Sequence, residues 1–219
     1  MQKDPDNALI SRFPMRRMEA EMVRDSLLKV SSRLDTRRFG PPEGIEATSE
    51  GEVLSKAVPT SCAGGVCVVP AFQSAVRRSI YTLQRRDTPL TLLEAFDAPY
   101  LEPNSLKRGY STVPTQALQL MNGGLIRQTA RYFSGRVMDE AGANVEQQVE
   151  HAYIAALSRL PQPEELKAAA QMIQQATAEW KMYLDRDDQP EPRRMQSEWL
   201  GLASFCHVLL NSPDFLYID

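Results

Sequence analysis

Hydrophobic positions in the first part of the chain recur with a helical period. Between residues 16 and 35, Met18, Met22, Val23 and Leu27 follow helical spacing, while charged side chains fill the other faces. A helix with this pattern packs one apolar face on a core and exposes the opposite face to water. The segment therefore predicts an amphipathic helix.

Helix-breaking residues follow this segment. Gly40 and the two prolines after it stop a helix, and the small and acidic residues up to position 60 show no sustained period. We interpret residues 40–70 as a loop or an insertion. Residues 66–72 are rich in β-branched side chains and residues 79–84 alternate, so we expect these two runs to pair as a small β-ribbon that leans on the helices.

An unusual proline-bearing stretch spans residues 87–114. It carries Leu92, Leu93, Phe96 and Tyr100, which is more apolar surface than a loop in solvent needs. We expect a long, ordered loop segment that these side chains attach to the core.

Helical periods dominate the second half of the chain. They cover residues 114–122, 125–142, 145–160, 163–184 and 198–219. Proline stands at the first position of two of these ranges, where its missing N–H costs nothing. The predicted fold class is therefore mainly α: an irregular multi-helix domain with a small β-ribbon and a long ordered loop segment.

The first of these helices has recognisable ends. Ser111 or Thr112 offers a capping oxygen upstream of Pro114. Asn122, with the two glycines after it, tolerates a left-handed exit from the helix. Residues 185–194 are charged and contain proline, so we interpret them as a linker.

The composition is that of a folded protein. The chain has 219 residues, of which 42% are hydrophobic and 24% charged, and we expect a single domain over residues 1–219. The net charge of −3 gives no general electrostatic reason to bind nucleic acid. No apolar run approaches the roughly 20 residues that cross a bilayer. The first residues lack the pattern of a secretory signal peptide.

Three cysteines raise the question of a disulfide or a metal site. Cys62 and Cys67 are separated by four residues that include two glycines, so a local disulfide is geometrically feasible, and two unpaired loop thiols are the alternative. The spacing differs from the C-x-x-C-H of covalent haem attachment. A zinc site would need ligands from Cys206, His151 or His207, which lie far along the chain, so we expect no metal site.

The block from residue 77 to residue 122 holds the best candidates for a ligand site. Arginine, carboxylate and amide groups of this kind bind anions and sugars. The candidates are Arg78, Glu94, Asp97, Arg108, Thr115, Gln116 and Asn122. The alternative, which we favour, is that the arginines of the block pair with Glu94 and Asp97 and so hold the irregular segment in place.

An enzyme is the rival hypothesis. Paired carboxylates can serve as general acid and base, and Glu94 lies three residues before Asp97. A hydrolytic or electron-transfer-linked site would draw on Arg78, Glu94, Asp97, Arg108 and Gln116. Against it, the sequence contains no G-x-S-x-G motif, no Walker loop and no H-E-x-x-H motif.

Four blocks of the sequence are similar, in this order, to a known family: residues 16–35, 77–99, 108–122 and 205–219. Together they resemble the planctomycete-specific C-terminal domain of unknown function number 1553. The resemblance covers nearly the whole chain, and none of the blocks is a catalytic signature. The stretch around the cysteine pair matches no motif of the family, so no role carries over to those cysteines.

The resemblance implies a large exported protein in which this domain follows another domain of unknown function and often a cytochrome c-like domain. It implies a location outside the cell or in the cell envelope. Haem would belong to absent upstream domains, and we expect no cofactor within this chain. The chain looks like a fragment or a split member of the family. Its expected partners are the upstream domains of the parent protein or a partner chain.

The sequence therefore favours a non-catalytic or accessory C-terminal module of a larger exported protein. Its expected task is to bind a glycan or a partner domain.

Overall fold

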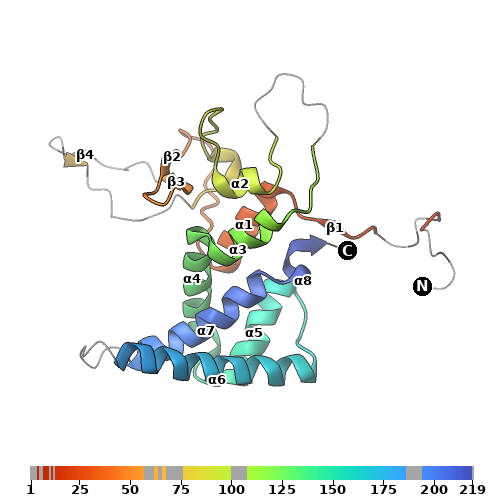
Figure 1. Ribbon diagram of the computed structural model, residues 1–219, viewed down its shortest axis with the longest axis vertical. Helices are drawn as coiled ribbons and strands as arrows, with labels where there is room; N and C mark the ends of the chain where they lie inside the picture. Colours follow the sequence, from red (N-terminus) through yellow and green to blue (C-terminus); the bar gives the residue numbers. More distant parts are fainter. Residues whose placement is uncertain are drawn as a thin grey trace.

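The computed structural model is a mainly helical molecule, as the sequence predicts. It describes residues 4, 7–9, 11, 13–56, 62–63, 66–67, 76–99, 108–185 and 194–218. A bundle of long helices forms one end of the molecule, and shorter helices with a β-hairpin form the other end (Figure 1).

The helices include each one that the periodicity predicts. They are α1 (Ala20–Val30), α2 (Thr91–Ala95), α3 (Pro114–Asn122), α4 (Gly124–Ala141), α5 (Val145–Leu157), α6 (Pro163–Asp185), α7 (Arg194–Leu210) and α8 (Pro213–Leu216). Helices α7 and α8 share the last predicted range, and α2 lies inside the segment that was predicted as an ordered loop.

Helix α1 shows how the sequence pattern becomes a packed element. Val23 and Leu27 are fully buried, whereas Met22 on the opposite face is exposed. Glu21 in the first turn and Lys29 in the last turn complement the helix dipole. The amphipathic helix is confirmed, but Met22 does not belong to its buried face.

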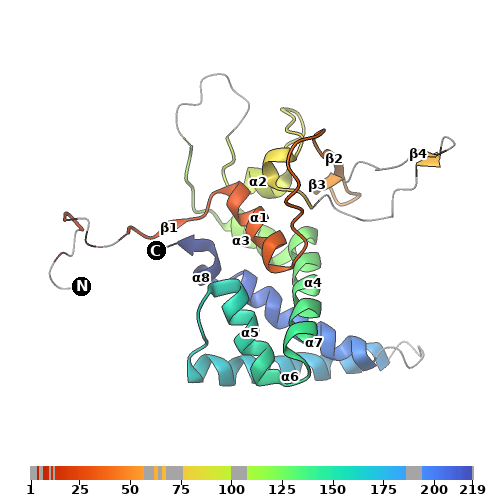
Figure 2. The ribbon, with the colours of Figure 1, turned by 180° about the vertical axis from the view of Figure 1, so that it is seen from behind.

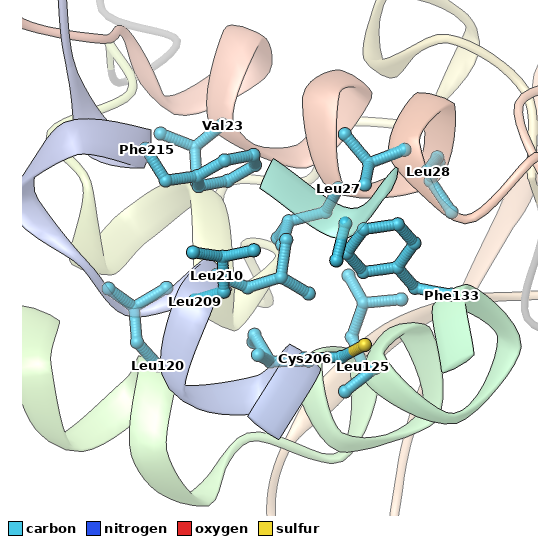
Figure 3. Close-up of a cluster of buried hydrophobic side chains, with 14 of the residues drawn as sticks. Val23, Leu27, Leu28, Leu120, Leu125, Phe133, Cys206, Leu209, Leu210 and Phe215 are labelled. Atoms are coloured by element: carbon cyan, nitrogen blue, oxygen red, sulfur yellow. The ribbon is translucent and has the colours of Figure 1, made fainter. Parts of the chain in front are cut away.

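One hydrophobic core joins the two ends of the molecule. Leu27 of α1, Phe133 of α4 and Cys206 of α7 meet in it (Figure 3). Within the bundle, α7 packs on both α4 and α6. At Gly201 the backbone of α7 runs so close to α6 that an added Cβ would lie 2.1 Å from Thr177 Oγ1. Only glycine fits there without a shift of the helices.

The described strands form two-stranded antiparallel sheets. Their pairs are β1 (Arg16–Arg17) with β6 (Tyr217–Ile218), β2 (Gly44–Ala47) with β3 (Val53–Lys56), and β4 (Cys62–Ala63) with β5 (Val66–Cys67). Because β1 pairs with β6, Arg16–Arg17 lie beside the last described strand of the chain (Figure 2).

The strands differ from the predicted ribbon in two places. The β2–β3 hairpin lies inside the range 40–70 that was interpreted as a loop or insertion. Ser79–Tyr81, predicted as part of a strand, is the 3-10 turn η1. The reason is a tertiary contact, because the backbone N–H and the hydroxyl of Ser79 both bind Asp25 of α1. Of residues 66–72, the other part of the predicted ribbon, residues 68–72 lie outside the described residues.

The junction between α3 and α4 is stabilised by a residue far away in the sequence. Glu52, before β3, accepts hydrogen bonds from Gln119 Nε2 at 2.9 Å and from the backbone N–H of Gly124 at 3.0 Å. A carboxylate at a helix N-terminus compensates the free amide groups there. The left-handed exit predicted at Asn122 is wrong, because Gly123 has φ −60° and ψ 134° and α4 begins directly after it.

The irregular segment is attached to the core by its apolar side chains, as predicted. Leu92 and Phe96 are almost fully buried. Asp97 follows with a left-handed backbone, φ 62°, which asparagine and aspartate tolerate better than most residues. Tyr100 and residues 186–193 of the predicted linker lie outside the described residues.

Candidate functional site

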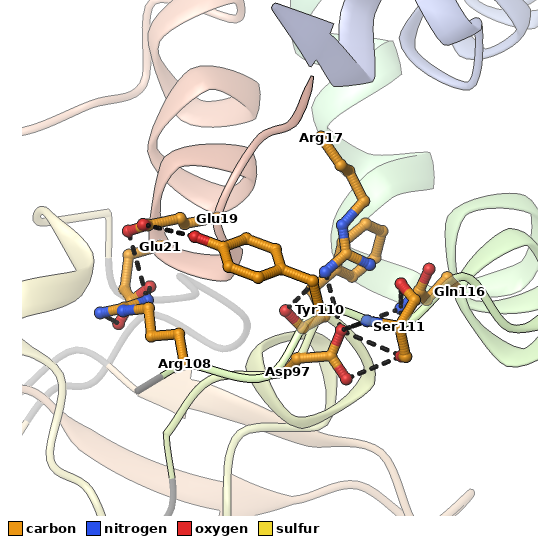
Figure 4. A network of polar contacts seen from close by, with 9 residues as sticks. Arg17, Glu19, Glu21, Asp97, Arg108, Tyr110, Ser111 and Gln116 are labelled. Atoms are coloured by element: carbon orange, nitrogen blue, oxygen red, sulfur yellow. Dashed lines mark hydrogen bonds and ion pairs between the residues drawn. The ribbon is translucent and has the colours of Figure 1, made fainter. Parts of the chain in front are cut away.

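Asp97 is the centre of the first polar group among the predicted site residues. Its Oδ2 accepts hydrogen bonds from Arg17 Nη2 and from the backbone N–H of Ser111, both at 2.8 Å, and its Oδ1 accepts one from Ser111 Oγ at 2.8 Å (Figure 4). The side-chain amide of Gln116 donates to the carbonyl oxygen of Ser111 at 3.2 Å. The group thus joins β1, the end of α2 and the start of α3.

Arg17 is a largely buried partner of this carboxylate. Its guanidinium also donates to the carbonyl oxygen of Phe96 at 3.2 Å and lies over the Phe96 ring. Burial acts to raise the pKa of Asp97, but the hydrogen bonds from Ser111 and Arg17 outweigh it, so the pKa lies below the usual aspartate value. Asp97 is therefore ionised at neutral pH and bound by donors of the protein itself.

Arg108 forms a second group at the start of α1. Its guanidinium donates to both carboxylate oxygens of Glu21, at 2.7 and 3.0 Å, and lies 3.4 Å from Glu19. Tyr110 donates its hydroxyl to Glu19 at 3.2 Å, and its ring lies between the Arg108 group and the Asp97 group (Figure 4). The bidentate hydrogen bond from Arg108 lowers the pKa of Glu21.

Arg78 belongs to a third group, one turn further along α1. Its Nε lies 3.5 Å from Asp25, which also accepts hydrogen bonds from the N–H and the hydroxyl of Ser79, both at 2.7 Å. Arg24, fully buried, donates to Ser55 Oγ at 2.9 Å. These contacts attach η1 and β3 to α1.

The remaining predicted residues do not join these groups. Glu94 is exposed on α2, and Thr115 and Asn122 are exposed at opposite ends of α3. The predicted capping oxygen is also absent, because Val113 directly precedes α3 and the hydroxyl of Ser111 binds Asp97 instead. Of the predicted ligand set, the structure brings Asp97 and Gln116 together, with Arg108 in the neighbouring group.

The favoured prediction that arginines of the block pair with Glu94 and Asp97 is wrong, because these groups have other partners. Asp97 binds Arg17, and Arg78 and Arg108 bind carboxylates of α1 rather than those of α2. Sequence reasoning missed Arg17, Glu21 and Ser111. No local signal marks the first two, since Arg17 lies 80 residues from Asp97 and Glu21 lies 87 residues from Arg108.

Glu43 is a buried carboxylate outside the predicted set. Its Oε1 accepts a hydrogen bond from the backbone N–H of Arg77 at 3.2 Å, and its Oε2 is buried without a hydrogen-bond partner among the described residues. Thr82 forms a backbone bridge with Glu43. Its buried hydroxyl also has no hydrogen-bond partner among the described residues. Burial raises the pKa of Glu43 above the usual glutamate value.

The ionised carboxylates of these groups are poor proton acceptors. A general base works best with a pKa near the operating pH and must reach the proton that it takes up. Asp97 and Glu21 have lowered pKa values, and arginine donors occupy their oxygens. Their arrangement is suited to holding Asp97 against β1 and the chain at Arg108 against α1.

The two histidines lie in separate places. His151 of α5 pairs with Glu140 of α4, and the ring of His207 in α7 contacts the carbonyl oxygen of Leu120. Within the described ranges, no group of three or more His, Cys, Asp and Glu side chains is arranged to hold a metal ion. Over the same residues, no helix has the length and apolar character that crossing a membrane requires.

The comparison with known proteins gives one family. The family model for a protein of unknown function (DUF1553) matches residues 1–173. The resemblance to domain number 1553 that the sequence blocks suggested is thereby confirmed. No curated protein matches the chain, and no solved structure does.

Proposed function

Because the chain belongs to the DUF1553 family of proteins of unknown function, we propose that it is a non-catalytic accessory module. In this proposal it is the C-terminal part of a larger exported protein of the planctomycete type, located outside the cell or in its envelope. Its task is to dock on a neighbouring domain or a partner chain. Any haem belongs to that neighbouring part, and the chain itself carries no cofactor.

The observation that carries this proposal is a contrast between polar and apolar side chains. The candidate acids Asp97 and Glu21 are bound by arginines of the chain itself, which argues against a hydrolytic or electron-transfer-linked site around them. Large apolar side chains next to these groups are exposed: Met22 to 42%, Tyr110 to 57% and Ile80 to 79%. Exposed apolar groups with a polar rim are typical of protein interaction sites.

These three apolar side chains flank one side of α1, and we call them the α1 face. At about 100° per residue, Met22 lies on the outward side of the helix close to Asp25 and away from the buried Ala20. Ile80 follows Ser79, which binds Asp25, and Tyr110 binds Glu19 directly before the helix. The ion pairs fix the backbone that presents the face, which reduces the cost of binding.

The test is co-elution with the neighbouring domains of the parent protein, expressed as a separate chain. Wild type is expected to co-elute with them in size-exclusion chromatography, and Ile80→Asp is expected to weaken binding at least about tenfold, since it places a charge in the apolar contact. Leu160→Asp is the matched control, because Leu160 is exposed elsewhere. Equal binding by both variants, or turnover of substrate by the isolated chain, contradicts the proposal.

Glycan binding is the second candidate function, and Tyr110 favours it. An exposed aromatic ring with carboxylates beside it offers a stacking face and acceptors for sugar hydroxyls. Affinity electrophoresis in gels that contain soluble polysaccharides tests this candidate. Retardation that Tyr110→Ala abolishes and Tyr110→Phe retains supports a sugar platform. Retardation unchanged in Tyr110→Ala, or none for the wild type, rules it out.

A further inference from the structure

Phe39 combines an exposed aromatic side chain with a strained backbone. Its side chain is 83% exposed, more than any other large apolar side chain of the described residues. Its φ of 64° lies in the left-handed region, where a bulky residue is an outlier. Such a residue costs stability and persists only where its surroundings impose the conformation. Packing in the core does not explain this cost, because the ring faces water.

Arg77 and Tyr81 impose the conformation of Phe39. The guanidinium of Arg77 donates to the carbonyl oxygen of Phe39 at 2.6 Å. It also donates to the carbonyl oxygens of Arg37 at 3.2 Å and of Pro41 at 3.0 Å. The hydroxyl oxygen of Tyr81 accepts a hydrogen bond from the backbone N–H of Phe39 at 2.9 Å, and the Arg77 guanidinium lies over the Tyr81 ring. Both polar backbone groups of Phe39 are therefore fixed.

We call residues 37–41, which curve round the Arg77 guanidinium, the Phe39 arch. Backbone hydrogen bonds hold the chain on both sides of it. The N–H of Asp35 donates to the carbonyl oxygen of Val76 at 2.8 Å, and the N–H of Glu43 donates to that of Tyr81 at 2.7 Å. A side chain on so fixed a backbone loses little further freedom when it binds, which reduces the cost of binding.

The exposed charges beside the ring are positive. Arg37, Arg38 and Arg78 all expose their side chains. Asp35, the partner of Arg37, is far less exposed than the arginine. The same holds for Asp25, which lies 3.5 Å from Arg78. Aromatic and arginine side chains are enriched at protein interfaces, and charges across an interface are complementary. A surface that fits the arch therefore has a pocket for the ring and carboxylates at its rim.

We propose that Phe39 is an anchor for a protein partner. Its ring inserts into an apolar pocket of that partner, and Arg38 and Arg78 contact carboxylates at the rim of the pocket. This inference rests on the proposed docking function and names the chemistry of the surface that is bound. Ile80 of the α1 face directly precedes Tyr81, which holds Phe39, so the Phe39 arch extends that face.

A protein partner fits these observations better than an anionic membrane does. Segments that bind anionic lipids typically carry clusters of about 4–8 lysine and arginine residues. Arg37, Arg38 and Arg78 are fewer, and carboxylates lie beside the first and the last of them. A lipid surface also accepts a ring in many orientations, so it gives no reason to hold Phe39 in a strained conformation.

Phe39→Gly in the full chain separates a binding role from a structural one. Glycine adopts a positive φ without strain, so the midpoint of urea denaturation is expected to stay unchanged or to rise. Affinity for the neighbouring domains of the parent protein, measured by biolayer interferometry, is expected to fall at least about tenfold. Wild-type affinity in this variant, or a lower urea midpoint together with the loss of affinity, overturns the anchor.

Phe13→Gly is the matched control, because Phe13 is also exposed and its ring lies beside the guanidinium of Arg16. It is expected to leave the affinity nearly unchanged, and a loss as large as that of Phe39→Gly contradicts the inference. If Ile80→Asp weakens binding and Phe39→Gly does not, the docking function stands and the Phe39 anchor fails. If the wild type does not bind the neighbouring domains, both fail.

Arg38→Glu tests the acidic rim of the pocket. It places a negative charge opposite carboxylates, so it is expected to weaken binding at least about tenfold at low salt. Added salt is expected to weaken wild-type binding and to reduce the difference between the two chains. Wild-type affinity in Arg38→Glu overturns the acidic rim. Sedimentation with phosphatidylglycerol vesicles that Phe39→Gly abolishes would assign the anchor to a membrane and overturn the protein partner.

Discussion

At the scale of single residues, the charged side chains of the candidate site act as cross-links between distant segments. Arg17 and Asp97 connect β1 to the end of α2, and Arg108 and Glu21 connect the start of the α3 segment to α1. The sequence shows that such residues are present and predicts an irregular segment that must be attached to the core. It does not show the partners, because long-range pairing depends on the packing of α1, which local spacing does not encode.

Glu43 gives a prediction for the pH dependence of stability. Burial raises its folded-state pKa above the ordinary value of 4.5, so the folded chain keeps this proton to higher pH than the unfolded chain does. The stabilisation that Glu43 contributes is present at pH values below its ordinary pKa and is lost as the pH rises through its folded-state pKa. Glu43→Gln is expected to flatten this part of the profile, measured as the free energy of unfolding in urea between about pH 4 and pH 8.

Glu46→Gln is the control for this prediction, since Glu46 is exposed on β2, which begins directly after Glu43. It should leave the pH profile of the wild type nearly unchanged. An unaltered slope in Glu43→Gln would show that the buried carboxylate does not bind its proton more tightly in the folded state.

At the scale of elements, the long helices could be predicted, whereas the short helix α2 and the β2–β3 hairpin could not. Helical periodicity is a local property, so the ranges 114–122 and 163–184 correspond closely to α3 and α6. The β2–β3 hairpin and η1 depend on contacts with other parts of the chain. Their own sequences carry little periodic signal.

The close approach of α6 and α7 gives a second prediction. Gly201→Ala is expected to lower the free energy of unfolding by about 1–3 kcal/mol, because the new Cβ would overlap Thr177 and push the helices apart. Chemical denaturation measures the change.

Gly135→Ala is the matched control, also in the interior of a long helix. A Cβ at Gly135 would meet Trp199 Nε1 at 3.7 Å, an ordinary van der Waals distance. This variant is expected to gain about 0.5–1 kcal/mol from the better helix propensity of alanine. A loss of similar size in both variants would contradict the role assigned to the α6–α7 contact.

At the scale of the whole molecule, the Asp97 group lies where the described chain closes on itself. Arg17, which binds Asp97, is in β1, and its backbone pairs with Tyr217 of β6. The group therefore joins segments from near the beginning, the middle and the end of the described chain. The sequence indicates that Asp97 and Gln116 belong to a polar group, but it does not place them beside the paired strands β1 and β6.

We propose that this polar group holds the fold rather than performing chemistry. The most direct test is a double-mutant cycle of Arg17→Met and Asp97→Asn, followed by urea denaturation, with the exposed Arg16→Met as control. Each single variant is predicted to lose about 2 kcal/mol, with a coupling energy on the order of 1–3 kcal/mol, while the control stays within about 0.5 kcal/mol. Additive effects, or wild-type stability in both single variants, would contradict the claim.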